Sequence, residues 1–347
     1  MHSSRRDLRH SGVARSHSIS MKRVRGIRAA ALFVGSVVGA GFATGQEISL
    51  FFGGDGVGSL VVASVFMAVC AFAFLDMGAR RVASDPRLMV ATDTAVALSS
   101  FAVYAAMIAA AEEVLFRLTG MAWLSVPLAL GASVVASSRI SWLTALNVVA
   151  VPLMAAVIVA VGARAETVMG GAFHPFRAVA YGGMNLLFSG ALMIGEGEKL
   201  TFGERVTASV TAGVMIFVML LFMHRCTAGA GGIEMPFLAA ASRDGLGTFA
   251  SLALLLAVVT TMASCAYLLI CRLTVLTRDR TLASSVTTLA GTLTSTVGFA
   301  PLVAYTYPVI SFLGLAATLA ALAYFLFRIC KQSLRRNAAR ILTRLKL

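Results

Sequence analysis

The chain has 347 residues, 59% of them hydrophobic and only 13% charged, whereas a soluble domain carries about a quarter charged residues. Its 29 Lys and Arg outnumber the 15 Asp and Glu and give a net charge of +14. Because this basic excess lies in the two tails and in short loops between continuous apolar runs, it argues against nucleic-acid binding and against a β-barrel. The composition indicates an all-α membrane protein with many spans.

The first residues of the chain, 1–20, are polar and rich in Arg, Ser and His, which predicts a disordered basic tail. The basic head and apolar core at 21–45 are also compatible with a secretory signal peptide. Since Gln46 and Glu47 stand where a cleavage region would lie, and many apolar runs follow, we favour a first membrane span. A single transmembrane domain is then expected over 21–328, with a basic cytoplasmic tail at 329–347.

Apolar windows of about 20 residues predict ten membrane spans. They cover residues 27–52, 57–78, 94–117, 121–138, 141–163, 177–199, 205–224, 246–271, 281–299 and 302–327. If the N-terminus is inside, nearly all Lys and Arg lie on the cytoplasmic side; the exceptions are Arg117, Arg164, Arg177, Arg225 and Arg243. This asymmetry predicts ten helices in the cell (inner or plasma) membrane, in contact with its lipid bilayer and with both termini cytoplasmic.

The two halves of the chain share a pattern of connections. The longest connection follows the second span of each half, at 79–93 and at 225–245, and the two would lie on opposite sides of the membrane. Five helices repeated with inverted topology are a recurrent plan of transporters. We therefore expect one repeat at about 27–163 and a second at about 177–328.

The first predicted span is interrupted by glycines, at Gly35, Gly39, Gly41 and Gly45. These glycines form two GxxxG pairs, so close packing between helices is one explanation. Glu47 favours another, because a carboxylate inside a membrane helix must face protein or a water-filled cavity. A helix unwound near Gly39 to Gly41 would offer backbone carbonyls and helix ends to a ligand.

Residues 34–52, VGSVVGAGFATGQEISLFF, resemble the first-helix signature of the YkvI-type membrane proteins. These are relatives of the amino acid–polyamine–organocation superfamily, which has the leucine-transporter fold. Weaker matches are Tyr181 with Asn185, Thr260-Thr261, and Tyr307-Pro308. The resemblance implies a 5 + 5 inverted repeat, discontinuous helices 1 and 6, and a substrate site between them. The substrate-binding residues it implies are Gly39, Ala40, Gly41, Phe42, Thr44, Glu47, Tyr181, Asn185 and Ser189.

The sixth span is the symmetry mate of the first and would also have to break. Ser189-Gly190 falls near mid-membrane, and Asn185 lies one turn above on the same face. The other explanation is a packed seam of small residues, with Asn185 bonded across helices.

The eighth span carries the hydroxyl residues Thr260, Thr261 and Ser264. In the leucine-transporter arrangement, two adjacent hydroxyls on this helix and carbonyls of the unwound first helix form a sodium site. The resemblance therefore implies a sodium ion bound by Val38, Thr260, Thr261 and Ser264. Hydroxyls bonded back to the preceding turn of their own helix are the competing explanation, and proton coupling through Glu47 is the competing mechanism.

The function expected is a secondary active transporter that moves a small, amino-acid-like solute by alternating access, coupled to sodium or protons. The alternative is a non-transporting membrane receptor or an ion channel on the same scaffold. The sequence has no P-loop, HExxH or GxSxG motif, so we expect neither an enzyme nor any cofactor other than sodium. Residues 233–242 are expected to form an amphipathic outer segment, and Asp76 with Arg80 and Glu113 with Arg117 to form surface ion pairs.

Overall fold

A computed structural model describes residues 25–81, 86–138, 140–165, 170–227 and 233–345. This part of the chain is almost entirely helical, and its one extended pairing is an isolated bridge between Asp55 and Ala172. The all-α prediction is therefore confirmed. The tail predicted at residues 1–20 lies outside the described residues.

The first apolar segment forms three short helices: residues 25–37, α2 (Ala40–Thr44) and α3 (Gln46–Phe52). The helices that follow are α4 (Val57–Ala79), α5 (Pro86–Thr119), η1 (Ala122–Leu124), α6 (Ser125–Ser138), α7 (Ile140–Arg164), α8 (Pro175–Gly197), α9 (Phe202–Thr227), α10 (Pro236–Arg243), α11 (Gly247–Thr277), α12 (Arg280–Ser295) and α13 (Phe299–Leu345). The short helix α10 coincides with the predicted amphipathic segment 233–242.

Within the described residues, six helices are long and apolar enough to cross a membrane: α4, most of α5, α8, α9, α11 and the first part of α13. The chain is thus a multi-pass membrane protein. Each of the ten predicted windows falls on helix, but α12 has 16 residues, about 24 Å at 1.5 Å per residue. Because that is shorter than the hydrocarbon core, the count of ten spans stays a prediction.

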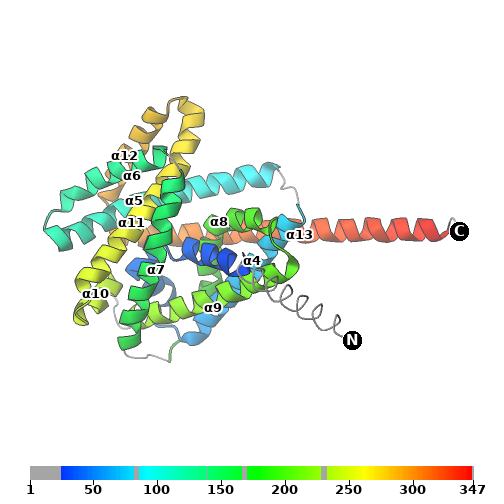
Figure 1. Ribbon diagram of the computed structural model, residues 1–347, viewed down its shortest axis with the longest axis horizontal. Coiled ribbons are helices and arrows are strands. Elements are labelled where there is room, and N and C mark those ends of the chain that lie inside the picture. Colours follow the sequence, from blue (N-terminus) through cyan, green and yellow to red (C-terminus); the bar gives the residue numbers. More distant parts are fainter. Residues whose placement is uncertain (1–24, 82–85, 139, 166–169, 228–232, 346–347) are drawn as a thin grey trace, which may run out of the picture.

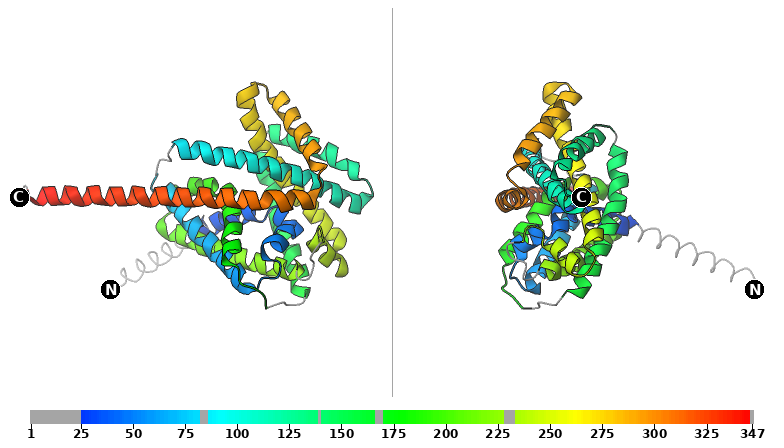
Figure 2. Two further views of the ribbon diagram at one scale, coloured as in Figure 1. Left: turned by 180° about the vertical axis from the view of Figure 1, so that it is seen from behind. Right: turned by 90° about the vertical axis from the view of Figure 1, so that its left-hand side faces the viewer.

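The helices pack in two groups (Figures 1 and 2). In the first group α4 packs along α8 and α9, and in the second α11 packs along α5, α6 and α12. Two helices join the groups, since α13 packs on both α8 and α5 while α7 packs on both α9 and α11. The C-terminal part of α13 continues beyond the bundle as a lone helix (Figure 1).

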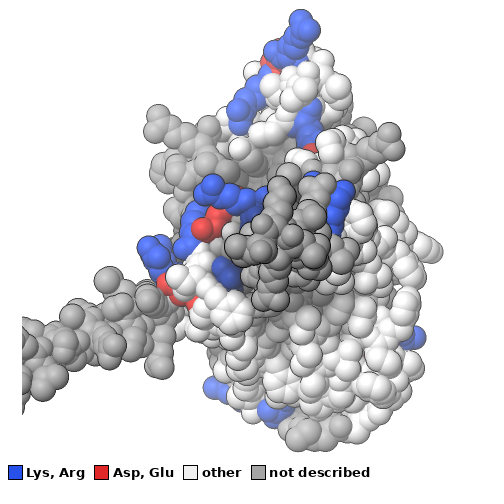
Figure 3. Space-filling view, turned by 90° about the vertical axis from the view of Figure 1, so that its right-hand side faces the viewer, with Lys and Arg blue, Asp and Glu red and all other residues white. Residues whose placement is uncertain are grey.

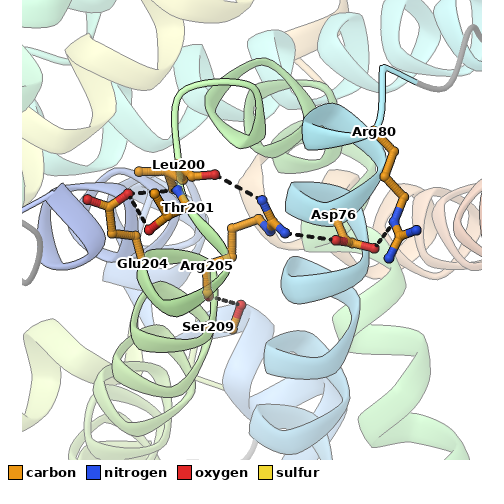
Figure 4. Close-up of polar contacts among 7 residues, drawn as sticks. All are labelled: Asp76, Arg80, Leu200, Thr201, Glu204, Arg205 and Ser209. Carbon is orange, nitrogen blue, oxygen red and sulfur yellow. Dashed lines mark hydrogen bonds and ion pairs between the residues drawn. The ribbon is translucent and has the colours of Figure 1, made fainter.

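Several basic residues lie on the face of the molecule that Figure 3 shows. Arg80, Arg81, Lys199 and Arg205 lie where α4 and α8 end and α9 begins. Arg205 in α9 contacts Asp76 of α4 at 3.1 Å and donates to the carbonyl of Leu200 at 2.9 Å (Figure 4). Asp76 also pairs with Arg80 at 2.6 Å. The side chains of Arg205 and Asp76 are only 11% and 9% exposed. The predicted pair Asp76–Arg80 therefore forms with Arg80 half exposed, as expected at the surface, while the Asp76 carboxylate is buried and joins α4 to α9 through Arg205.

The start of α9 is capped next to this cluster by the side chain of Glu204. Glu204 accepts from the backbone N–H of Thr201 at 2.7 Å and from its hydroxyl at 2.9 Å (Figure 4). A carboxylate in this position satisfies a backbone donor at the start of a helix that has no partner within it. The cap and the Arg205 cluster together hold the turn between α8 and α9. We call the end of the molecule at which this turn lies the basic end.

The sixth predicted span is α8, and it is one continuous helix, so the predicted break there is wrong. Its polar side chains bond within the helix: Asn185 donates to the carbonyl of Tyr181 at 3.0 Å, and Ser189 donates to that of Asn185 at 2.8 Å. Its glycines allow close packing instead, because a Cβ on Gly183 would lie 2.7 Å from the backbone nitrogen of Leu315 in α13. The packed-seam explanation holds here, with Asn185 bonded inside its own helix.

Candidate functional site

The first apolar segment is broken at Val38-Gly39, close to the predicted position. Gly39 N–H turns back to the carbonyl of Val37 (2.9 Å), and Ala40 N–H donates to the hydroxyl of Thr261 in α11 (3.2 Å). In a continuous helix these two N–H groups would bond to carbonyls four residues back. A side chain from the other helix group thus replaces a bond of the helix ladder, and Gly41 lies inside α2 and not in the break.

A second interruption follows at Gly45, which has a φ of +78°. This left-handed conformation suits glycine, and an added Cβ would lie 2.8 Å from the Thr227 methyl group. Thr44 stabilises the turn, since its hydroxyl donates to Gly41 O (2.8 Å) and accepts from Gln46 N–H (3.2 Å). The turn directs α3 so that Glu47 points into the protein.

A cavity of about 770 Å³ begins at these breaks and lies between the two helix groups. Its wall includes most of the predicted site: Val38, Gly39, Ala40, Gly41, Phe42, Glu47, Asn185, Thr260, Thr261 and Ser264. At its other extreme it reaches Met77, Asp93, Arg272 and Tyr324, toward the basic end. Asp93 and Arg272 pair at 2.7 Å, and their side chains are 51% and 50% exposed. The cavity therefore opens at the basic end.

Glu47 lies at the deep end of the cavity and is only 4% exposed. Tyr181 of α8 donates its hydroxyl to Glu47 Oε1 at 3.3 Å. The Tyr307 hydroxyl of α13 lies close by, because a Cβ on Gly41 would be 2.7 Å from Glu47 Oε2 and 2.6 Å from Tyr307 Oη. The absence of a side chain at Gly41 thus leaves room there for both the Glu47 carboxylate and the Tyr307 hydroxyl.

Three predicted substrate residues do not line the cavity. Thr44 and Ser189 are fully buried and bond to nearby backbone. Tyr181 is also fully buried, and its hydroxyl reaches the site by donating to Glu47. Sequence reasoning missed Asp93 and Arg272 as neighbours, because they lie on helices far apart in the chain and no local pattern relates them.

The hydroxyls of the predicted sodium site are arranged in two ways. Thr261 receives the Ala40 N–H, which brings α11 against the broken helix. Thr260 donates to Ala257 O (2.9 Å) and Ser264 to Thr260 O (2.8 Å), as in ordinary back-bonding. All three residues line the cavity, and sodium binding there stays a prediction.

The deep end of the cavity is separated from the other end of the molecule by α3 and α10. Helix α10 packs on α2, α3, α9 and α11. With its amide nitrogen facing acceptors, the Gln46 side chain donates to the carbonyls of Ile233 (3.1 Å) and Glu234 (2.9 Å), just before α10. Phe237 of α10 is fully buried. The molecule is closed here and open at the basic end.

A scan against protein-family models and a search of curated proteins both found no match to this chain. The resemblance of residues 34–52 to the YkvI-type proteins therefore stays a prediction.

Proposed function

We propose that the protein is a secondary active transporter that moves a small solute by alternating access, coupled to sodium or protons. The observation that supports it best is the single cavity that joins the broken first segment, Glu47 and Thr261 between the two helix groups. A broken helix is costly in a membrane unless its free backbone groups line a cavity. Here they do.

The arrangement of the helices supports the same proposal. The cavity is closed by α3 and α10 at one end and open at the basic end, as in one of the two states that alternating access requires. Rocking of the α4–α8–α9 group against the α5–α6–α11–α12 group would open the other end. We propose further that the chain has ten spans in a 5 + 5 inverted repeat of the leucine-transporter type, with an unbroken α8 as its departure from that plan.

The experiment begins with a thermal-shift screen of amino acids, amines, organic acids and sugars, each with and without sodium. Labelled forms of the stabilising solutes are then tested for exchange in proteoliposomes, with protein-free liposomes as the control. Uptake that is accelerated by unlabelled solute inside supports the transporter. Binding without exchange would instead show a receptor, and flux that internal solute does not accelerate would show a channel.

The coupling ion is tested on the same vesicles by imposing a sodium gradient or a pH gradient alone. A sodium-coupled protein accumulates solute under the first gradient and a proton-coupled one under the second. Accumulation under neither gradient would contradict secondary active transport.

A further inference from the structure

The charges that line the cavity are unevenly distributed. Of the residues that the structure describes, three charged ones line it: Glu47 at the deep end, and Asp93 and Arg272 at the mouth, where they pair with each other. The groups that face Glu47 are the hydroxyls of Tyr181 and Tyr307 and the backbone of α2, all uncharged. The deep end therefore carries one carboxylate and, within the described residues, no side chain that would balance it.

The backbone at the break adds to this negative character. Helix 25–37 ends at the cavity, and Gly35 and Ser36 both line it. Their carbonyls do not receive the N–H groups of Gly39 and Ala40, which bond elsewhere. Carbonyls at the C-terminal end of a helix carry partial negative charge and attract cations. Backbone and side chain thus favour a positively charged group at the same place.

A carboxylate on the solute would have no comparable place. The space beside Gly41, at the start of α2, is already taken by the carboxylate of Glu47 and the hydroxyl of Tyr307. A second carboxylate there could not be ionised together with Glu47 without like-charge repulsion in a region shielded from water, which is destabilising. Among the described residues, the one cation on the cavity wall is Arg272, which lies at the mouth and is paired with Asp93.

We propose, on the basis of the proposed transport function, that the cavity takes an organic ammonium ion without a carboxylate, and that this ion and a proton alternate on Glu47. A buried carboxylate is stable only when it is neutral or paired with a cation. In the empty site Glu47 holds a proton. When the ammonium enters, its N–H groups bond to the carboxylate oxygens, and the Glu47 proton leaves to water through the open mouth. The charge of the site is unchanged, so the exchange of one proton for one ammonium is electroneutral.

The first test compares solutes that share a carbon skeleton, using the full chain in nanodiscs. One set is phenethylamine, phenylalanine and 3-phenylpropionate, and the other is isoamylamine, leucine and 4-methylpentanoate. We expect each amine to bind at least about tenfold more tightly than its amino acid, a difference of about 1.4 kcal/mol, and the acids not to bind. An amino acid that binds as tightly as its amine would overturn the proposed solute class.

The second test counts protons. Calorimetry in two buffers with different heats of ionisation should show about one proton released per amine bound. Glu47→Gln, which keeps the shape and an acceptor for Tyr181, should remove both amine binding and proton release. Glu113→Gln, in the i, i+4 pair with Arg117 away from the cavity wall, should leave both unchanged. Because the wild-type count needs no variant, amine binding without proton release overturns the exchange even if Glu47→Gln does not fold.

Proteoliposomes separate this inference from the transport proposal. An outward gradient of amine should drive proton uptake at a rate that does not respond to an imposed membrane potential, above the leak of protein-free liposomes. Amine binding with proton release but no such exchange would refute transport and leave the ligand class standing. Exchange of amino acids without amine binding would refute the inference and leave transport standing.

Discussion

The broken segment at residues 25–52 and the continuous helix α8 meet at the bond between Glu47 and Tyr181, and both are rich in glycine. In the first segment, glycines leave the helical conformation, at Gly39 with an extended backbone and at Gly45 with φ +78°. In α8 the glycines stay helical and bring neighbours close: Gly182 lies against Phe66 and Gly183 against the backbone of α13. The first segment breaks where the Thr261 hydroxyl accepts a backbone N–H that would otherwise bond within the helix. Helix α8 stays continuous where neighbouring helices pack against its glycines.

The largest effect is expected from Gly314→Ala, at the crossing of α13 with α8. The added Cβ would collide with the carbonyl oxygen of Gly183, and backbone cannot move aside as a side-chain tip can. Overpacking of this kind costs about 3 kcal/mol of unfolding free energy. It can be followed in detergent with a thiol-reactive dye, because Cys70, Cys226 and Cys265 are buried in the folded protein. A stability within about 0.5 kcal/mol of wild type would show that α8 and α13 do not touch here.

The next effect is expected from Gly45→Ala in the broken segment. The left-handed conformation costs an L-residue about 1–2 kcal/mol, and the Cβ would also press on the Thr227 methyl group. Gly54→Ala is the matched control, since Gly54 has φ +81° and no atom within 4 Å of its added Cβ. The dye assay should therefore show a larger loss of stability for Gly45→Ala. Equal losses would mean that the contact between the added Cβ and Thr227 of α9 contributes nothing to the loss of stability.

A smaller effect is expected from Thr261→Val, which leaves Ala40 N–H without its partner. An unsatisfied N–H costs about 1–3 kcal/mol of unfolding free energy when it is buried. Because Ala40 and Thr261 line the cavity, we expect a loss at the low end of this range, about 1 kcal/mol. Thr260→Val is the control, because the Thr260 hydroxyl bonds only within α11. The two unfolding free energies are compared first without sodium.

The same pair of variants tests the sodium site. If Thr260 and Thr261 both bind sodium, each variant should lose any stabilisation that wild type gains from added sodium. If sodium stabilises wild type and Thr260→Val equally, the predicted ligand set is wrong.

The smallest effect is expected from Ser189→Ala in α8. Its hydroxyl bonds to Asn185 O within a helix whose backbone bonds are already complete, so we expect a loss below about 0.5 kcal/mol. Solute binding, measured by thermal shift, should also be unchanged, because Ser189 does not line the cavity. A clear loss of binding would indicate that Ser189 contacts the solute and that α8 opens at this position during function.

The sequence by itself determined that the chain is an all-α, multi-pass membrane protein, because long apolar runs in lipid must satisfy their backbone bonds internally. It also determined the position of the first break to within a residue or two, since glycine has a low helix propensity and Gly45, with φ +78°, adopts a conformation that other residues resist. The ion pair Glu113–Arg117 was also predicted, because helix geometry alone brings residues at i and i+4 together.

Only the tertiary structure decided which glycine-rich segment breaks. In α8, the side chains of Asn185 and Ser189 bond to carbonyls of the same helix, and α13 packs against its glycines. Helix α8 therefore stays continuous although its sequence resembles the first segment in glycine and polar residues. Likewise, the burial of Asp76 by Arg205, and the meeting of Glu47 with Tyr181 and Tyr307, join residues from distant helices. Such contacts depend on how close two helices approach each other, and no local spacing in the sequence contains that distance.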